Sequence, residues 1–217
     1  MRTDDLIDAL AQDAQASGRG PTRAPPKRLA MVAGLGALAA LVLMLAWLHT
    51  RHDLMPAMRG GMFWMKALYT GALGLAGYLA IERLSRPAGS GRRGWMLGGA
   101  VLGLFALAGV VQAMMSPDIQ MALHMLRGHS WHVCSRNILM LGLPMLGLGL
   151  WAVRGMAPTR PVAAGFATGL FAGGVAATVY GLHCAENTFT FVALWYSLGV
   201  LSLAVLGALI GRWALRW

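Results

Sequence analysis

Residues 180–189 read YGLHCAENTF and place an imidazole, a thiol and a carboxylate close together, on His183, Cys184 and Glu186. The other cysteine, Cys134, stands near the end of a second polar segment, residues 116–137. Thiolate, imidazole and thioether groups are the ligands that soft or borderline ions such as Cu(I) and Zn(II) prefer. Two thiols in an oxidising compartment can instead form a disulfide. These residue types therefore indicate metal-binding or redox chemistry.

Residues 116–137 supply further candidate ligands. The order Ser116-Pro117-Asp118 predicts the N-cap and first turn of a short helix, and Gly128 predicts its end. One face of this helix is apolar and suits the membrane surface. That face consists of Ile119, Ala122, Leu123 and Leu126. The candidate metal ligands in and after the helix are Met121, His124, Met125, His129 and His132.

Each of these residues also has a more ordinary explanation. A single loop histidine is more often solvated than a ligand, and methionine in a membrane helix is usually filler. The chain has neither a CxxC nor an HExxH motif, so a metal site would have to be assembled from several loops. For the cysteines three interpretations stay open: a structural disulfide, a switching thiol pair or metal site, and two unrelated buried thiols.

The composition is that of an integral membrane protein. Of the 217 residues, 57% are hydrophobic and only 12% are charged, which is about half the charged fraction of a soluble domain. A helix crosses a bilayer with roughly 20 apolar residues. We therefore predict an all-α bundle of six transmembrane helices, with a kink at Pro144 in the fourth. The predicted spans are residues 29–48, 63–81, 95–115, 137–153, 161–182 and 189–210.

The distribution of Lys and Arg predicts the orientation of this bundle. Most of the 18 basic residues lie on the side of both termini, which is therefore predicted to be cytoplasmic. The net charge of +10 reflects this topology and anionic lipid, and it does not indicate nucleic-acid binding. The opposite, outer side holds both cysteines and all six histidines: His49, His52, His124, His129, His132 and His183. This segregation favours a function on the outer face.

Two features of the spans bear on that face. Small residues recur at every fourth position of the fifth span and predict close helix packing: Gly165, Gly169, Gly173, Ala177 and Gly181. Cys184 follows this ridge by one turn and is predicted to lie over the bundle. Lys66 lies within the second span and is expected to face the interior or to snorkel outward, paired with Glu186 or Asp53.

Residues 1–28 form a separate segment before the transmembrane domain of residues 29–217. Thr3 is a good N-cap, and Asp4 and Asp5 favour a helix of about 14 residues. Its apolar stripe consists of Leu6, Ile7, Leu10 and Ala14. Residues 17–26 are a linker rich in Gly, Pro and Arg. The segment is either a solvated tail or a recognition helix that folds against a partner.

The start TDDLIDALA resembles the N-terminus of NrsF-type anti-sigma factors (negative regulators of sigma F), six-helix inner-membrane proteins of Gram-negative bacteria. The resemblance continues in one order through Arg51, Asp53-Leu54, Lys66, Arg86-Pro87, Cys134, Pro144, Ala157-Pro158, Tyr180, His183-Cys184, Glu186, Trp195-Tyr196 and Leu215-Arg216-Trp217. It implies that the cytoplasmic segment sequesters an extracytoplasmic-function (ECF) sigma factor. It also implies that Cys134 and Cys184 are needed to respond to metal or oxidative stress outside.

The predicted function is therefore that of an inner-membrane anti-sigma factor with an outer sensor site, and not that of an enzyme. Its partners are a sigma factor and the lipid bilayer; a Cu or Zn ion is expected as a signal, not as a resident cofactor. The residues predicted to bind sigma are Thr3, Asp4, Asp5, Leu6, Ile7 and Leu10. An alternative, a metal-ion transporter, would need polar ligands at mid-membrane, where the sequence offers almost none apart from Lys66, Gln112 and scattered Ser and Thr residues. A membrane thiol oxidoreductase would need cysteines at short spacing.

Overall fold

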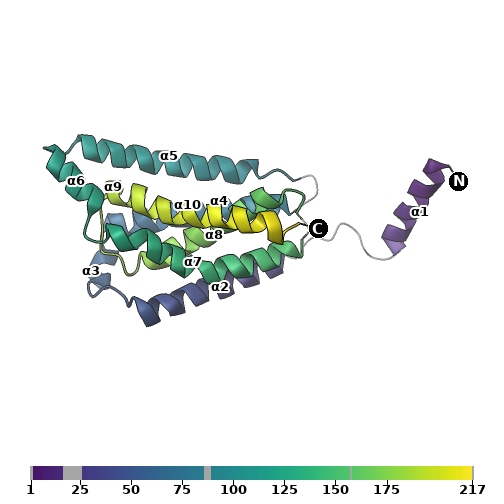
Figure 1. The fold of residues 1–217 in the computed structure, drawn as a ribbon, viewed down its shortest axis with the longest axis horizontal. Coiled ribbons are helices and arrows are strands. Elements are labelled where there is room, and N and C mark those ends of the chain that lie inside the picture. Colours follow the sequence, from purple (N-terminus) through teal and green to yellow (C-terminus); the bar gives the residue numbers. More distant parts are fainter. Residues whose placement is uncertain (1, 17–25, 86–88, 157, 217) are drawn as a thin grey trace.

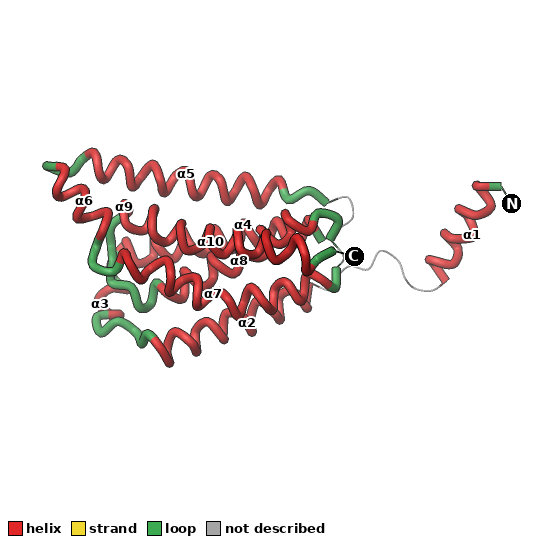
Figure 2. Tube along the Cα trace, in the orientation of Figure 1, coloured by secondary structure: helices red, strands yellow, loops and turns green. Residues whose placement is uncertain are grey.

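The computed structural model describes residues 2–16, 26–85, 89–156 and 158–216. No strand occurs in these ranges, which confirms the predicted all-α fold (Figures 1 and 2). The helices are α1 (Thr3–Ala16), α2 (Pro26–Trp47), α3 (Leu54–Met58), α4 (Gly61–Leu84), α5 (Arg92–Met114), α6 (Ile119–Arg127), α7 (Trp131–Arg154), α8 (Pro161–Tyr180), α9 (Phe189–Phe191), the π-helix η1 (Val192–Tyr196) and α10 (Ser197–Ala214).

The bundle consists of α2, α4, α5, α7, α8 and the continuous stretch from α9 through η1 to α10 (Figure 1). Helix α8 is its central member and packs against α4, α7, α10 and, less extensively, α2. The short helices α3 and α6 and the start of α9 lie at one end of the bundle. The start of α2 and the end of α10 lie at the other end (Figure 1). The segments that carry the histidines and cysteines, residues 49–52, 124–134 and 183–184, are therefore gathered at one end, which we call the cysteine end.

Five of these long helical stretches are long and apolar enough to cross a membrane; they contain α2, α5, α7, α8 and α9–α10. Helix α4 is not among them, because it carries Lys66 near one end and Glu82 and Arg83 at the other. Its 24 residues still measure about 36 Å, more than the thickness of a hydrocarbon core. Six spans therefore remain the prediction, and α4 is the span that composition alone supports least.

Two predicted helix ends need correction. Helix α7 begins at Trp131 and not near residue 137, so Cys134 lies in its first turn and not in a loop. The helix also continues past Pro144. Helix α6 is capped by Asp118, whose side chain accepts a hydrogen bond from the Met121 main-chain N–H at 2.7 Å; Ser116, the predicted cap, precedes it. Its predicted end at Gly128 is confirmed.

The predicted N-terminal helix is present as α1, and its cap differs by one residue. Thr3 is its first helical residue, and the main-chain oxygen of Arg2 accepts the first helical bond, from Leu6 N–H. The Asp5 carboxylate accepts a hydrogen bond from the Arg2 main-chain N–H at 3.2 Å, as the third helical residue does in a capping box. Leu6 and Ile7 are 43% and 58% exposed, so this apolar face is available for a partner.

The small-residue ridge of α8 packs as predicted. A Cβ atom at Gly165 would overlap the main-chain oxygen of Gly207, and one at Gly173 would lie 2.9 Å from Val200 Cα, both on α10. The backbones of α8 and α10 thus touch along this face, which only residues without a side chain allow. On another face, a Cβ atom at Gly174 would lie 2.5 Å from Gly74 Cα on α4.

This packing makes the effect of one methyl group predictable. In Gly169→Ala the new Cβ would lie 2.6 Å from Ala204 Cα and would collide with the Leu203 carbonyl, so we expect the unfolding free energy to fall by about 1–3 kcal/mol. The measurement is reversible unfolding in detergent micelles. The control is Gly103→Ala on α5, where no atom lies within 4 Å and helix propensity should raise stability by about 0.5–1 kcal/mol. Equal stability of the two variants would contradict the packing described.

Candidate functional site

The two cysteines, fifty positions apart in the chain, lie in one buried cluster at the cysteine end of the bundle. Cys134 in the first turn of α7 is fully buried, and Cys184 in the loop of residues 181–188 is 3% exposed. Both are free thiols, and they lie close enough to interact electrostatically. The Ser130 hydroxyl lies 3.9 Å from the Cys184 sulfur. Of the three interpretations left open by the sequence, this arrangement favours a thiol pair over two unrelated thiols.

Two tyrosines and an asparagine complete the buried surroundings of the thiols. Tyr180 at the end of α8 and Tyr196 at the end of η1 are both buried, with ring centroids 5.8 Å apart. The Tyr196 hydroxyl faces Cys184. Within the described ranges, neither this hydroxyl nor Oδ1 of Asn137 has a partner at ordinary hydrogen-bond distance. Polar groups buried without partners are rare in native structures, and they mark this cluster as more than a packed core.

The π-helix is the local feature that brings Tyr196 there. A π-turn inserts one extra residue into a helix and rotates the side chains that follow it, and such turns are frequent at functional sites. The Ser197 hydroxyl, directly after η1, is hydrogen bonded to the Ala193 carbonyl and lies 2.5 Å from the Tyr69 hydroxyl. These bonds fix the register of α10 beneath the thiols. No pattern in the sequence signals the π-turn, so Tyr196 was not predicted as a site residue.

Lys66 reaches this cluster from α4. Its side chain is 1% exposed, and its Nζ donates hydrogen bonds to the main-chain oxygens of Cys184, at 2.9 Å, and Glu186, at 3.1 Å. The expected pairing with the carboxylate of Glu186 or Asp53 is therefore wrong. Lys66 binds carbonyls because buried main-chain oxygens need donors and because both carboxylates are bonded elsewhere.

The Glu186 carboxylate joins the two cysteine segments. Its Oε1 accepts hydrogen bonds from the main-chain N–H groups of His129, at 2.6 Å, and Ser130, at 3.2 Å, at the start of α7. A helix N-terminus favours a negative charge, so this carboxylate acts as a cap. Gly128 makes the approach possible: its φ is +53°, and a Cβ atom there would lie 2.7 Å from Glu186 Cδ. The carboxylate thus fixes the Cys184 loop on the helix that carries Cys134.

A second contact holds the same loop from the α2–α3 side. The main-chain N–H of Arg51 donates to the Leu182 oxygen at 3.2 Å, and its Nη1 donates to the Cys184 oxygen at 3.4 Å. The guanidinium forms a paired contact with Asp53, both bonds being 2.6 Å long. This contact lowers the pKa of the Asp53 carboxyl and raises that of Arg51. His183 donates from Nδ1 to the His49 oxygen at 2.8 Å.

The remaining predicted ligands do not join the thiols. The rings of His124 and His129 lie edge to face, with centroids 5.8 Å apart, and His132 packs beside Trp131. Met125 turns toward the bundle, where its sulfur accepts from the Ser116 hydroxyl at 3.8 Å, and Met121 is 45% exposed. Across the described ranges, no three His, Cys, Asp or Glu side chains come together as they would around a metal ion.

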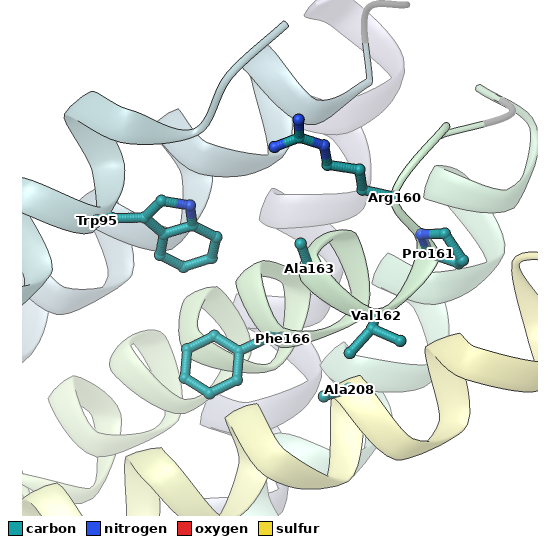
Figure 3. A pocket seen from close by; sticks show the side chains of 7 residues that line it. All are labelled: Trp95, Arg160, Pro161, Val162, Ala163, Phe166 and Ala208. Atoms are coloured by element: carbon teal, nitrogen blue, oxygen red, sulfur yellow. The ribbon is translucent and has the colours of Figure 1, made fainter.

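Two of the cavities differ in size, lining and position. The larger, about 630 Å³, lies between α5, α8 and α10 near the end opposite the thiols (Figure 3). Its lining is apolar apart from Arg160, with the rings of Trp95 and Phe166 5.7 Å apart, so it suits a hydrocarbon chain better than a reaction. A smaller cavity of about 240 Å³ lies between α4 and α8 and includes Lys66 in its wall.

Comparison with known proteins shows the family to which this chain belongs. The sequence model of a family described as "Negative regulator of sigma F" (NrsF) matches residues 10–217. The chain belongs to the NrsF family. It is 68% identical to the anti-sigma-F factor NrsF of Caulobacter vibrioides and 41% identical to the probable anti-sigma-F factor NrsF of Azospira oryzae. Each comparison covers the whole of both chains. No solved structure matches the chain.

Membership of the NrsF family confirms the resemblance drawn from the sequence and places the chain among negative regulators of a sigma factor, which are not a class of enzyme. In this NrsF-family bundle the described site has two buried free thiols and a buried lysine hydrogen bonded to the Cys184 main-chain oxygen. Helix α1, with its exposed apolar face, lies away from this site (Figure 1).

The carboxylate that joins the two cysteine segments gives a prediction. Glu186→Ala leaves the His129 and Ser130 N–H groups without their acceptor, which should lower the unfolding free energy by about 1 kcal/mol, as loss of a helix cap does. It should also slow disulfide formation between the cysteines after addition of diamide, followed by gel shift. The control is Asp118→Ala, which removes a cap of the same kind from α6 but has no bond to the Cys184 loop. Equal rates in both variants would contradict the role of Glu186.

Proposed function

We propose that this chain is an inner-membrane anti-sigma factor that binds an ECF sigma factor through residues 1–28 and releases it when the thiols of Cys134 and Cys184 are oxidised from the periplasm. The observation that carries the proposal is the contact between two buried free thiols at the end of the bundle away from the start of α2. The anti-sigma part is supported by the names of the two relatives.

Helix α1 has the properties of a sigma-binding element. A helix of 14 residues is marginal alone and gains stability when its apolar stripe is covered. Leu6 and Ile7 are exposed, while Asp4, Asp5 and Asp8 give the rest of the helix a negative charge. Such a helix suits an apolar groove with a basic rim. The side chain of Leu10, the third predicted anchor, lies outside the described residues.

The proposed orientation rests on charge. Among the described residues, several arginines lie at helix ends on the side where α2 starts and α10 ends: Arg83, Arg92, Arg93, Arg154 and Arg212. Such residues mark the cytoplasmic side of a membrane protein. Residues 1–28 would then face the cytoplasm, where sigma factors work, and the thiols would face the periplasm, where disulfides form. The two proposed activities thus need the same orientation.

Oxidation is the signal that the geometry supports best. The hydrogen bond from the Cys134 thiol, and after it the positive charge of Lys66, lower the pKa of Cys184 below its ordinary value. A thiolate beside a second thiol is the arrangement that forms a disulfide readily. A zinc ion would need more donors than two sulfurs, and the described histidines do not join the thiols to supply them.

The two side chains considered as ion ligands for a transporter are engaged in other contacts. Oε1 of Gln112 accepts hydrogen bonds from the main-chain N–H and the hydroxyl of Thr190, at 3.0 and 3.1 Å, and so ties α5 to α9. Lys66 is engaged with two carbonyl oxygens. The side chains of Lys66 and Gln112 are therefore both used in contacts that hold the bundle together, which counts against their acting as ion ligands.

The sigma-binding helix gives the first test of this function. Leu6→Glu places a charge on the exposed apolar stripe, and we expect it to weaken co-purification with the cognate sigma factor by at least about tenfold, since burying an unpaired charge costs several kcal/mol. The measurement is pull-down of sigma with the full-length chain in detergent. The control is Gln12→Glu, which adds the same charge to an exposed polar position of α1. Undiminished binding by Leu6→Glu would refute the assignment.

The thiol pair gives the second test. Cys134→Ser and Cys184→Ser should each abolish induction of sigma-dependent transcription by an oxidant while basal repression persists, because serine keeps the packing but cannot form a disulfide. The measurement is a transcriptional reporter with and without the oxidant. As matched controls, His124→Gln and His129→Gln alter the nearby imidazoles and should leave induction intact. Normal induction in both cysteine variants would overturn the sensor role, whereas loss of induction in the histidine controls would point to a metal site.

A further inference from the structure

Lys66 is a buried cation without a carboxylate partner. Its side chain is 1% exposed, and the acceptors of its Nζ are two main-chain oxygens, which are dipoles and carry no net charge. Each described carboxylate at the cysteine end is bonded elsewhere: Asp53 to Arg51, Asp118 to the Met121 N–H and Glu186 to the N–H groups of the two residues before α7. A buried charge is normally paired, so the compensating negative charge has to come from another kind of group.

The thiol of Cys184 is the group able to supply that charge. The titratable groups that face Lys66 are the thiols of Cys184 and Cys134, the Tyr196 phenol, the Arg51 guanidinium and the Glu186 carboxyl. A thiol is more acidic than a phenol by more than a unit. Of the two thiols, Cys184 is carried by the residue whose own oxygen accepts from Lys66, and the Ser130 hydroxyl lies 3.9 Å from its sulfur.

We propose that Lys66 and Cys184 form a buried ammonium–thiolate pair, and that loss of the thiolate charge on disulfide formation is the event that changes the packing of the bundle. This inference rests on the proposed function and deepens it. It assigns Lys66 as the positioning residue of the switch, acting through Cys184 and without contact to the sigma factor.

Hydrogen peroxide can serve as the two-electron oxidant that forms the disulfide between Cys134 and Cys184. The Cys184 thiolate attacks one peroxide oxygen, the O–O bond breaks, and a sulfenic acid and hydroxide are formed. The Cys134 sulfur then attacks the Cys184 sulfur, the S–O bond breaks, and the departing hydroxide takes the Cys134 proton as water. Two sulfurs are oxidised and one peroxide is reduced. The net change at the site is the loss of one negative charge, while Lys66 keeps its positive charge.

The fold leaves space into which the Lys66 side chain can move once the disulfide has formed. The cavity of about 240 Å³ beside it is lined by Met58, Trp64 and Gly181, among others, and gives the ammonium space to leave its unpaired position. Such a movement would break its bonds to the Cys184 and Glu186 oxygens. At the far end of the same helix, Ile81 and Leu84 pack in one buried cluster with Leu29 of α2, the helix that follows residues 1–25.

The first experiment measures the thiolate directly. We expect the purified full-length chain to show the ultraviolet absorbance of one thiolate at neutral pH, and Lys66→Met to raise the midpoint of its appearance by about 1–3 pH units. Lys66→Arg keeps the charge and should restore the wild-type midpoint. The matched control is Arg59→Met, which removes a positive charge from an exposed position at the same end of the bundle, and it should stay near wild type.

Either of two results would overturn the pair: no thiolate absorbance in the wild-type chain at neutral pH, or the same midpoint in Lys66→Met as in wild type. The wild-type measurement keeps the inference testable even if a Lys66 variant does not fold. Neither measurement involves the sigma factor. The ammonium–thiolate pair can therefore be refuted while the Cys134→Ser and Cys184→Ser reporter results still support the thiol switch.

The second experiment asks whether the charge drives release. The full-length complex of Lys66→Met with sigma is treated with hydrogen peroxide until the disulfide has formed, as verified by gel shift. We expect at least about tenfold less sigma to be released than from the wild-type complex, because no unpaired ammonium is left in the variant. Release equal to wild type, with the disulfide present, would show that the covalent bond alone drives the change and would overturn the role of Lys66.

Discussion

The whole site depends on how the main chain of residues 181–188 is satisfied at the end of the bundle. Buried carbonyl groups must find donors, and in this loop the donors come from outside it: Lys66 binds the oxygens of Cys184 and Glu186, and Arg51 binds that of Leu182. These bonds explain why an apolar span tolerates a lysine. They also explain why Cys184 has a fixed place over Cys134, and not the range of positions that an unrestrained loop would allow.

The close contact of α8 and α10 is the second condition for the site. Because Gly165, Gly169 and Gly173 allow backbone contact, the ends of α8 and η1 come close enough for Tyr180 and Tyr196 to enclose the same pair of sulfurs. The site is therefore built from α4, α7, α8 and η1 together, with the Glu186 carboxylate joining loop and helix. A change in any one of these contacts is felt by the others, as close packing requires.

The sequence predicts the features that repeat or segregate, and it misses those that depend on contacts between distant segments. Hydropathy, the four-residue glycine spacing and the charge distribution predict the helices, the α8 packing and the shared location of the cysteines. They do not predict that Glu186 caps α7, because the N–H groups concerned lie at residues 129 and 130. Nor do they predict the π-turn that places Tyr196. Asn137, a polar residue three positions after Cys134 in an apolar helix, is a signal that could have extended the predicted site.

Charge is a better source of motion here than bond formation. The two thiols already belong to one buried cluster, so the covalent step joins groups that are neighbours before oxidation. Removing one partner of a buried ion pair costs about 3–5 kcal/mol. Shifting the populations of two states from a ratio of about 1:99 to about 99:1 needs a free energy of about 5.5 kcal/mol. The free-energy cost of leaving the Lys66 charge uncompensated is therefore comparable to the free energy that a switch between two packings requires. A buried lysine destabilises a protein with a single state, but it can drive a protein with two states from one to the other.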